Sequence, residues 1–389
     1  MKIILIDNSF DTTGASKSLF NTIREITSKA DIEFVYIHPK NSKRTAFVRE
    51  AGFKSYELPF VEIRKSIVSI LLYFPYLLMN GYRVSRIAKR ERADLIHVND
   101  LYNMTGLVSK LFHKIKVVTH IRRMPESFPL FFHKLWSHVH IRFSDKIIAV
   151  SEANKNSMPP NKKTIVVYNP LPDKESHPLY PPKEKLNKEI RILYLANYNR
   201  GKGHQYAIEI VSIAAREFPE WKFYLDVYGG DFGLEKNREY KRELEQMAID
   251  KGIETLVHFN DKVNDSERIM KDHDLVLNLS DSESFSRLTL EALFYGVPII
   301  ATDVGGTGEM LINRRGGLLA PAKDVAKMYE AFRSLLEHDE LRVSHCQFSY
   351  QYVREQFNME KTSEKIMSLY REMTGIVAPQ PFEQMFVNE

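Results

Sequence analysis

Two glutamates in the second half of the chain, Glu283 and Glu291, have a spacing and surroundings that suit ligand binding. They stand eight positions apart, and Glu283 follows the apolar run Leu275–Leu279, which is predicted to be a buried strand. A carboxylate just past the end of a buried strand can accept hydrogen bonds from sugar hydroxyls. Glu291 lies in the helix predicted to come next, and the amides at a helix N-terminus favour anions. Ser284, Phe285 and Ser286 lead into this helix, and we expect the amides near Ser286 and Arg287 to point at phosphate oxygens. All four residues are candidates for ligand binding.

A second loop has the complementary chemistry. It follows the predicted strand Arg191–Leu195 and places Arg200 and Lys202 on either side of Gly201, with Gly203 just before a helix. Two cations beside exposed backbone amides and a positive helix end suit a diphosphate. The loop is not a Walker A motif, because the GxxxxGK[ST] spacing is absent. The two loops together predict a site that holds hydroxyls with carboxylates and phosphates with cations.

Two glycine-containing loops follow other predicted strands. Gly14, in DNSFDTTGASKSL, either lets the backbone approach a ligand or forms only a tight turn before a helix. Gly305 and Gly306, in TDVGGTGEM, occupy an equivalent position ahead of another helix.

The sequence DHD at Asp272–Asp274 has a spacing that binds metal ions in other enzymes. It precedes the predicted strand Leu275–Leu279, so it lies at the opposite end of the sheet from the loops described above. We interpret it as a helix end followed by the start of a strand, and we expect no metal site.

Length and composition favour a globular protein of two domains, because 389 residues exceed the size of an ordinary single core. A lone cysteine, Cys346, excludes an internal disulfide and fits a reducing compartment, so we expect a cytoplasmic protein. The start, MKIILIDNSF, is predicted to be a strand rather than a signal peptide. The apolar run Ser66–Met79 is shorter than the roughly 20 residues of a spanning helix, and Pro75 interrupts it.

Short apolar runs alternate with amphipathic helical patterns, which is typical of parallel sheets covered on both faces. The predicted fold class is α/β, with two doubly wound domains facing a central cleft. The runs predicted to be strands are Ile3–Ile6, Ile32–Ile37, Leu95–Val98, Val117–Thr119, Lys146–Val150, Thr164–Val167, Arg191–Leu195, Lys222–Tyr228, Leu256–Phe259, Leu275–Leu279, Pro298–Ala301 and Gly317–Leu319.

The domain boundaries follow from a charged, proline-rich segment, Asn169–Glu189, which can continue neither a sheet nor a helix. We expect an N-terminal domain over residues 1–170, a linker over 171–189 and a C-terminal domain over 190–355. A final amphipathic helix over 356–375, with Ile366, Leu369 and Met373 on one face, is expected to pack back toward the N-terminal domain.

The net charge of +5 is unevenly distributed, because Arg64–Arg92 and Phe112–Lys146 are rich in cations. The second segment also contains Phe131, Phe132 and Trp136. One interpretation of these two segments is that they form a long core helix and the basic wall of a pocket for an anionic ligand. The other is reversible docking on an anionic membrane surface, where basic residues bind headgroups and aromatic residues lie at headgroup depth.

As a set, these motifs resemble the glycosyl transferases group 1 family, which has the GT-B fold and retains the configuration of the transferred sugar. The family motif is a glutamate, seven residues and a second glutamate, followed by a G-x-P strand. Here it reads Glu283, SFSRLTL, Glu291 and YGVPIIATDVGGTGEM. The segments DKIIAVSEANKN, VVYNPLP, the GKG loop and GGLLAPAKD also fall in the family's order, so the resemblance covers nearly the whole chain.

The resemblance implies a role for each candidate residue. Glu283 would contact the hydroxyls of the donor sugar and help to hold the reacting centre, and Glu291 would bind the nucleotide ribose. Arg200 and Lys202 would neutralise the diphosphate as it leaves. His120, in VVTHIRRMPE, would reach the donor sugar from the first domain.

Some positions depart from the family pattern. Gly14 would lie beneath the donor phosphates or the acceptor, but Thr13 replaces a second glycine. Asn197 stands where the family often has an arginine, so Arg200 would act from a shifted position. Ser284 and Ser286 replace glycines after the first glutamate.

The sequence therefore predicts a retaining, metal-independent hexosyltransferase without a cofactor. It would move a sugar from a nucleotide-diphosphate donor to a hydroxyl of a glycan or lipid-linked acceptor, in surface polysaccharide or glycolipid synthesis. We expect no nucleic-acid partner, and peripheral contact with the inner face of the plasma membrane. The alternatives are a sugar-nucleotide epimerase of the same fold and a catalytically silent nucleotide-sugar-binding scaffold.

Overall fold

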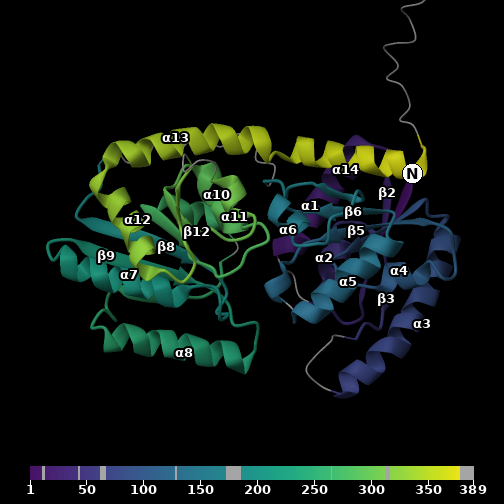
Figure 1. The fold of residues 1–389 in the computed structure, drawn as a ribbon, viewed down its shortest axis with the longest axis horizontal. Coiled ribbons are helices and arrows are strands. Elements are labelled where there is room, and N and C mark those ends of the chain that lie inside the picture. The colour runs from purple at the N-terminus through teal and green to yellow at the C-terminus, as the bar shows by residue number, and fades with distance from the viewer. Residues whose placement is uncertain are drawn as a thin grey trace, which may run out of the picture. The chain divides into compact units, whose positions relative to one another are not determined.

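The computed structural model describes residues 1–10, 14–42, 44–61, 67–127, 129–171, 185–263, 265–311 and 316–376, which form two compact units (Figure 1). Unit 1 comprises Met1–Val150, Lys155–Pro170 and the segment from Met359, and unit 2 comprises Ser151–Asn154 and Leu171–Asn358. Thr13 and most of the predicted linker over 171–189 lie outside the described residues.

Unit 1 is built on a parallel sheet with the strand order β3-β2-β1-β4-β5-β6-β7. Its strands are β1 (Lys2–Asp7), β2 (Glu33–Pro39), β3 (Lys54–Leu58), β4 (Leu95–Asn99), β5 (Lys116–Ile121), β6 (Lys146–Ala149) and β7 (Thr164–Val166). Its helices are α1 (Gly14–Lys29), α2 (Arg44–Glu50), α3 (Ile67–Glu91), α4 (Thr105–Ser109), the 3-10 turn Pro125–Ser127, α5 (Leu130–Phe143) and α14 (Met359–Thr374), and the short α6 (Glu152–Asn156) spans the division between the units.

Unit 2 contains a second parallel sheet with the order β10-β9-β8-β11-β12-β13. Its strands are β8 (Glu189–Leu195), β9 (Lys222–Tyr228), β10 (Val257–Asn260), β11 (Leu275–Asn278), β12 (Ile299–Thr302) and β13 (Leu318–Ala320). Its helices are α7 (His204–Glu217), α8 (Glu235–Asp250), α9 (Ser266–Lys271), α10 (Arg287–Tyr295), α11 (Thr307–Met310), α12 (Val325–Glu337) and α13 (Asp339–Gln356). Two parallel sheets with alternating helices confirm the predicted α/β class, whereas the central cleft stays a prediction.

Each predicted strand is present, with ends that differ by at most two residues. The strand that the sequence analysis missed is β3, with the sequence KSYEL. It lies at an edge of the first sheet, where most of its side chains are exposed, so it lacks the apolar run that marks the buried strands.

The first sheet shows why its central strands are apolar throughout. Alternate residues of a strand point to opposite faces. Ile3 and Leu5 of β1 pack in one buried cluster with α1 and α14, and Ile4 and Ile6 pack in another with α3. Both faces are therefore covered. The predicted face of α14 is buried in the first of these clusters through Ile366, Leu369 and Met373.

The helix α3 is not the buried core helix of the first interpretation given above. Its C-terminal half contributes Val84 and Ala88 to the core, but Leu71, Phe74 and Leu78 are 67%, 62% and 53% exposed. No helix in the described part of the chain is both long enough and apolar enough to cross a membrane.

In each sheet, the chain order reverses at one pair of neighbouring strands. These are β1 and β4 in unit 1, and β8 and β11 in unit 2. At such a reversal the loops beyond the carboxyl ends of the two strands run to opposite faces, which leaves room for a ligand between them. The loops after β8 and β11 contain the two cations and Glu283 of the sequence analysis.

A cluster of ionisable side chains around the buried Asp226 links four parts of unit 2. The carboxylate of Asp226 on β9 accepts a hydrogen bond from Arg191 Nη2 at 2.8 Å and contacts His258 Nδ1 at 2.7 Å and His273 Nε2 at 3.0 Å. Burial alone would raise the pKa of Asp226. The hydrogen bonds from His273, His258 and Arg191 outweigh that effect and hold the pKa of Asp226 below its ordinary value.

We expect Asp226→Asn to lower the free energy of unfolding by about 2 kcal/mol or more, because it removes the charge of a buried carboxylate that pairs with Arg191 and the buried His273. Since the pKa of Asp226 is lower in the folded than in the unfolded chain, its contribution is present above about pH 4 and is lost as the pH falls further. Urea unfolding at several pH values measures both effects. The control is Glu220→Gln, which removes an exposed ion pair with Lys188 in the same unit and is expected to leave stability unchanged.

Candidate active site

The two loops at the strand reversal of unit 2 meet through an ion pair. Lys202 Nζ lies 2.6 Å from Glu283 Oε1, and Ser280 Oγ donates a second hydrogen bond to the same oxygen at 2.9 Å. The two side chains are 33% and 18% exposed, so the pair is partly shielded and still reachable. The structure thus brings together the cation and the carboxylate that sequence analysis placed in separate loops.

Gly203 allows this approach of the two loops. A Cβ atom at this position would lie 2.0 Å from the carbonyl oxygen of Leu279, and the residue has a φ of +78°. Tyr194 holds the same junction, because its hydroxyl donates to the Lys202 carbonyl and accepts from the Leu279 amide at 3.3 Å. Burial raises the pKa of Tyr194 well above its ordinary value, so the hydroxyl keeps the proton that it donates.

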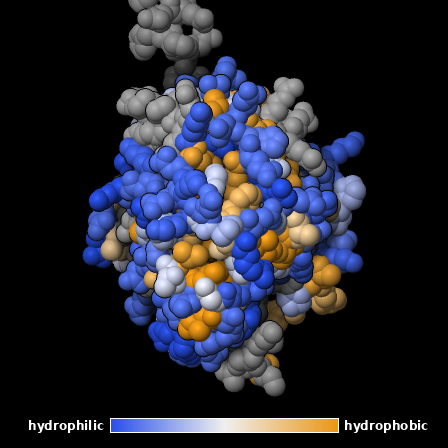
Figure 2. Space-filling model, turned by 90° about the vertical axis from the view of Figure 1, so that its left-hand side faces the viewer, coloured by the Kyte–Doolittle hydropathy of each residue, from blue (hydrophilic) through white to orange (hydrophobic). Residues whose placement is uncertain are grey.

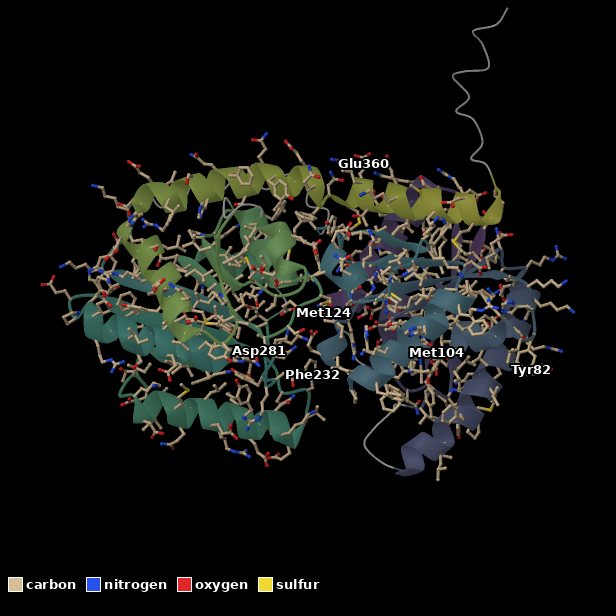
Figure 3. All side chains as sticks on the ribbon, viewed as in Figure 1. Tyr82, Met104, Met124, Phe232, Asp281 and Glu360 are labelled. Carbon is tan, nitrogen blue, oxygen red and sulfur yellow. The ribbon has the colours of Figure 1, made fainter. Side chains whose placement is uncertain are left out.

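Asp281 is a further acid at this junction that the sequence analysis did not single out (Figure 3). Its amide donates to the Gly201 carbonyl at 2.8 Å, and its carboxylate accepts from the Tyr206 hydroxyl at 3.2 Å. Its position in the loop after β11, two residues before Glu283, was the signal available in the sequence.

The start of α10 is fixed by side-chain capping. Ser286 is the N-cap and accepts from the Thr289 amide at 3.2 Å, and Asn278 at the end of β11 donates to Ser286 Oγ at 2.8 Å. Phe285 packs edge-on against Phe357. The capping places the N-terminal end of α10, with its partial positive charge, in the same loop as Glu283.

Glu291 lies one turn into α10 and is 6% exposed. Arg287 Nε donates to Glu291 Oε1 at 2.6 Å, while the Arg287 side chain itself is 42% exposed. The two candidates are therefore paired with each other, and Glu291 keeps its second carboxylate oxygen for another partner or for water.

The loop after β12 supports Glu283 from a third direction. The Gly306 amide donates to the Glu283 carbonyl at 3.1 Å, and a Cβ atom on Gly306 would lie 2.3 Å from the carbonyl oxygen of Ser284. Glu309, three residues later, accepts from the amides of Glu152 and Ala153 at 2.8 and 2.7 Å. The role of Glu309 as an acceptor for two backbone amides was not predicted.

Arg200 does not join Lys202. Its guanidinium contacts both carboxylate oxygens of Glu243 on α8, at 2.5 and 2.6 Å, and lies 4.9 Å from the ring centroid of Tyr240. Both members of this ion pair are more than half exposed. In this conformation Arg200 points to α8 and away from the Lys202–Glu283 pair.

The DHD sequence has the structural role that we expected. Asp272 is the C-cap of α9, and the Asp274 carboxylate accepts from the Arg191 amide at 2.8 Å just before β11. His273 belongs to the Asp226 cluster.

The two remaining candidates lie in unit 1. Gly14 is the first residue of α1 and is exposed. His120 lies at the end of β5 and is 2% exposed. Its Nδ1 atom is 3.2 Å from Arg122 Nη2, and its ring stacks on that of His97 with centroids 5.4 Å apart. Burial, together with the charge of Arg122 and the neighbouring His97, holds the pKa of His120 well below its ordinary value.

Two family models match the chain. The model described as Glycosyl transferases group 1 matches residues 178–351, and the model described as Glycosyltransferase Family 4 matches residues 12–174. The chain belongs to the group 1 glycosyltransferases. It is therefore a transferase enzyme of the family that the E-x7-E motif indicated.

Relatives of this glycosyltransferase are distant in sequence. It is 26% identical to the N-acetyl-alpha-D-glucosaminyl L-malate synthase of Bacillus anthracis over 332 residues, which is 80% of this chain and 83% of the relative. It is 26% identical to the D-inositol 3-phosphate glycosyltransferase of Corynebacterium urealyticum over 196 residues, which is 50% of this chain and 45% of that protein.

Solved structures share the fold of this glycosyltransferase over nearly its whole length. Anabaena HepE in complex with UDP has a TM-score of 0.79 at 18% identity, with 96% of this chain and 100% of that chain covered. Sucrose-phosphate synthase from Thermosynechococcus elongatus has a TM-score of 0.76 at 16% identity, with 96% and 99% covered. These likenesses confirm the GT-B fold.

We expect Gly203→Ala to destabilise unit 2 more than Gly252→Ala does. Both glycines have positive φ, so each alanine costs about 1 to 2 kcal/mol of backbone strain. A Cβ atom at position 203 would also collide with the backbone of Leu279, which adds about 1 to 3 kcal/mol to the cost. A Cβ atom at position 252 would have no atom within 4 Å, so it adds no such cost. Denaturant unfolding of the two variants measures the difference. Equal stabilities would contradict the close approach of the two loops.

Proposed function

We propose that this glycosyltransferase takes a sugar from a nucleotide-diphosphate donor and transfers it, with retention of configuration, to a hydroxyl of a glycan or lipid-linked acceptor. The observation that carries the proposal is the contact between Lys202 and Glu283 at the strand reversal of unit 2. A cation and a carboxylate side by side match a ligand that has phosphates at one end and hydroxyls at the other.

The ion pair is a resting arrangement in this proposal. Without a donor, Lys202 and Glu283 neutralise each other at 2.6 Å. A pyrophosphate carries more charge than a carboxylate and attracts Lys202 more strongly, so binding transfers the ammonium to the phosphates. Glu283 is then free to accept hydrogen bonds from sugar hydroxyls, and Ser280 Oγ and the Gly306 amide keep it in place.

The other candidates in unit 2 have supporting roles. The N-terminal end of α10, near Ser286 and Arg287, lies where its amides can stabilise phosphate oxygens. Glu291, held by Arg287, is placed to bind the ribose hydroxyls through its second oxygen. Arg200 reaches a phosphate only after it leaves Glu243, so we assign it a smaller share of the binding than Lys202.

The proposed reaction needs no protein nucleophile. The bond between the anomeric carbon and the diphosphate breaks as the sugar gains oxocarbenium character, and the acceptor hydroxyl attacks from the face that the diphosphate leaves. Lys202 and the α10 amides stabilise the negative charge that develops on the departing oxygen. These groups supply the positive charge that a metal ion would otherwise provide, so the proposed reaction is metal-independent and has no cofactor.

The relatives support the donor class. HepE has been crystallised with UDP-glucose, with a TM-score of 0.78 to this chain at 18% identity. One relative is named for L-malate and the other for D-inositol 3-phosphate, so we infer the acceptor of this chain from its own surface rather than from theirs.

An exposed apolar surface on unit 1 supports a lipid-linked acceptor. Leu71, Leu78 and Tyr82 are exposed and lie on one line along α3, because their spacings of seven and four residues return to the same side of a helix. The ring centroids of Tyr82 and Phe112 are 5.4 Å apart. The exposed loop residues Leu111 and Phe112 therefore extend this apolar line. We call these five residues the α3 apolar surface.

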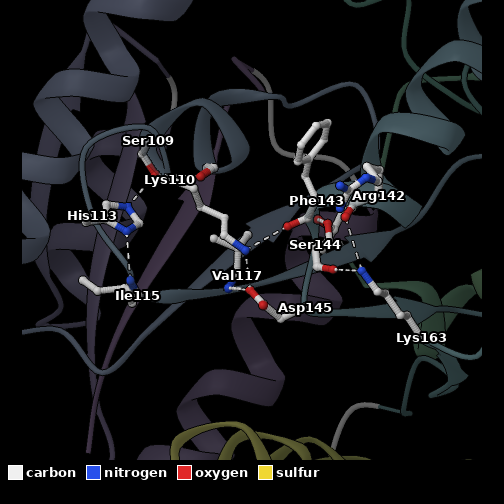
Figure 4. Close-up of polar contacts among 12 residues, drawn as sticks. Ser109, Lys110, His113, Ile115, Val117, Arg142, Phe143, Ser144, Asp145 and Lys163 are labelled. Carbon is white, nitrogen blue, oxygen red and sulfur yellow. Dashed lines mark hydrogen bonds and ion pairs between the residues drawn. The ribbon is translucent and has the colours of Figure 1, made fainter.

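Cations continue the same side of α3. Arg86 and Lys89 follow Tyr82 at four and seven residues and are exposed. Lys110 is not available to a membrane, because its ammonium contacts Asp145 and the Phe143 carbonyl (Figure 4). An apolar stretch followed by cations on one side of a helix matches the boundary of an anionic lipid layer.

The exposure of other side chains restricts which parts of the chain could contact a membrane. Trp136 is buried, so it is not one of the aromatic residues available to headgroups, whereas Phe131 and Phe132 on α5 are exposed. The side of the molecule that carries α7, α8 and α12 is largely hydrophilic, with apolar residues interspersed (Figure 2). We therefore place the peripheral contact with the inner face of the plasma membrane on α3, in the synthesis of surface polysaccharide or glycolipid.

We expect Lys202→Met to weaken the binding of a nucleoside diphosphate by about tenfold or more, since one charge-assisted contact to the diphosphate is lost. Arg200→Met is the matched control and should weaken binding less. Glu283→Ala should leave diphosphate binding in place and reduce sugar transfer by about a hundredfold or more. Calorimetry with UDP, GDP and ADP, and an assay of donor consumption with product analysis, measure these effects.

Three outcomes would count against the proposed transfer. Undiminished transfer by a folded Glu283→Ala variant would remove Glu283 from the site. Isomerisation of the donor without an acceptor would indicate an epimerase. Binding of the diphosphate without turnover over a broad acceptor panel would indicate a scaffold.

We expect binding to vesicles that contain anionic lipid and little binding to neutral vesicles. Lys89→Glu should weaken binding to the anionic vesicles by about fivefold or more, because each basic residue near such a surface contributes about 1 kcal/mol of binding free energy. Lys236→Glu, which changes an exposed helical lysine in unit 2, is the control and should have little effect. Vesicle flotation measures both, and binding that is indifferent to lipid charge would contradict the assignment.

A further inference from the structure

His273 is a buried histidine of unit 2 that has no part in the proposed reaction. It is the middle residue of the DHD sequence, between the end of α9 and the start of β11, and its side chain is 1% exposed. Its Nδ1 atom lies 2.6 Å from the carbonyl oxygen of Ile269, and its Nε2 atom lies 3.0 Å from Asp226 Oδ2. Both ring nitrogens therefore face an oxygen atom at hydrogen-bond distance.

The two oxygen atoms that face His273 can only accept hydrogen bonds. A backbone carbonyl has no proton to donate, and an ionised carboxylate has none either. Nδ1 must therefore donate to the Ile269 carbonyl, and Nε2 must donate to Asp226. An imidazole that donates from both nitrogens has two N–H groups, which makes it an imidazolium cation.

A neutral ring would fit only if Asp226 carried the proton and donated it to Nε2. The other contacts of Asp226 oppose this arrangement. Arg191 Nη2 donates to the same Oδ2 atom at 2.8 Å, and His258 Nδ1 lies 2.7 Å from Oδ1. Burial raises the pKa of Asp226, but the hydrogen bonds that it accepts outweigh burial and hold this pKa below its ordinary value. The carboxylate therefore stays ionised, and the proton stays on the ring.

The contact between His273 and Asp226 closes a ring of contacts across three strands. The amide of Asp274, the next residue, donates to the Arg191 carbonyl at 2.8 Å, and its carboxylate accepts from the Arg191 amide at 2.8 Å. The Arg191 side chain in turn donates to Asp226. These contacts join the start of β11 to β8 and β9, and β11 continues toward the loop that contains Glu283.

Among the described residues, Asp226 provides the carboxylate that contacts the His273 ring. Tyr228 on β9 meets the ring edge-on, with centroids 6.4 Å apart, and burial raises the pKa of Tyr228, so its hydroxyl is neutral. The other titratable groups around this cluster are Arg191 on β8, His258 on β10 and, on the segment of His273 itself, Glu267, Lys271, Asp272 and Asp274.

We propose that His273 is held as an imidazolium and that its second proton is a pH-sensitive latch between Asp226 and the start of β11. When that proton is lost to solvent, the ring can no longer donate to both oxygens, so one contact of the ring of contacts opens and leaves a buried group unpaired. The stability that the proton provides is present at low pH and is lost as the pH rises. This inference does not rest on the proposed function, because it concerns the folded protein without a donor.

The two ring protons can be observed directly. With 15N-labelled histidine, proton–nitrogen correlation shows whether Nδ1 and Nε2 each carry a proton. We expect both protons for His273, assigned by their loss in His273→Gln.

His138 is the matched reference in the same spectrum. Its Nδ1 atom also lies close to a helical carbonyl four residues earlier, at 2.7 Å, but the side chain is exposed and no carboxylate among the described residues contacts it. We expect His273 to keep its second proton to a higher pH than His138 does, because only His273 donates to a buried carboxylate.

Stability measurements test the latch separately. Gln at position 273 is neutral at every pH, so the difference between the wild type and His273→Gln isolates the protonation of this side chain from that of the other histidines. An exposed histidine loses its second proton near about pH 6.5. In urea unfolding from about pH 6 to about pH 9, we expect the wild type to have the higher midpoint at the low end, and the difference to shrink by about half or more at the high end. His138→Gln is the control and should show no such trend.

Each result decides a part of the proposal. A single ring proton on His273 at every pH at which the chain is folded, or a second proton lost at the same pH as that of His138, overturns the imidazolium. A difference in midpoint between the wild type and His273→Gln that does not change with pH overturns the latch, even if the ring is charged.

Asp226→Asn tests the origin of the charge. Its amide has no negative charge to hold the cation, so the second proton of His273 should leave at a lower pH than in the wild type. An unchanged pH in the folded variant would overturn the role of Asp226. If this variant does not fold, the spectrum of the wild type and the stability of His273→Gln still decide the proposal.

Discussion

The contact between Lys202 and Glu283 is the interaction on which the proposed donor site in unit 2 depends. It exists because the sheet reverses its chain order between β8 and β11, so the loops after these strands meet at one edge. Gly203 lets the first loop lie directly against the end of the second strand, since any side chain there would meet the Leu279 carbonyl. The ion pair is thus a consequence of strand order and of one residue without a side chain.

The surroundings of the pair make it exchangeable. A fully buried ion pair would hold its partners too firmly, because separating them leaves an unpaired charge in a medium of low dielectric. Lys202 is one-third exposed, so its ammonium can be passed to an anion, whereas the Ser280 hydroxyl keeps Glu283 in position when the lysine leaves. The capped start of α10 contributes partial positive charge that does not move at all. A mobile cation and a fixed helix end together suit a leaving group whose charge grows during the reaction.

The sequence predicted the sheets well because parallel strands covered on both faces are continuously apolar. That signal fails for β3, an exposed edge strand. One of the two interpretations of Arg64–Arg92 was a core helix, but Leu71, Phe74 and Leu78 of α3 are exposed. The E-x7-E motif located Glu283 and Glu291, since spacing along one loop and helix is a local property. Arg287 pairs with Glu291 within the same helix, but the lysine that pairs with Glu283 comes from another loop. Nothing in the sequence indicated that Arg200 turns to Glu243 or that Glu309 accepts from backbone amides, because each contact joins segments whose proximity only the fold determines.

The most direct measurement is the position of a nucleotide-diphosphate sugar in a crystal of this protein. We predict that the ammonium of Lys202 moves from the carboxylate of Glu283 to the pyrophosphate, and that hexose hydroxyls take its place on Glu283. A donor bound elsewhere, with the ion pair still closed at 2.6 Å, would contradict it.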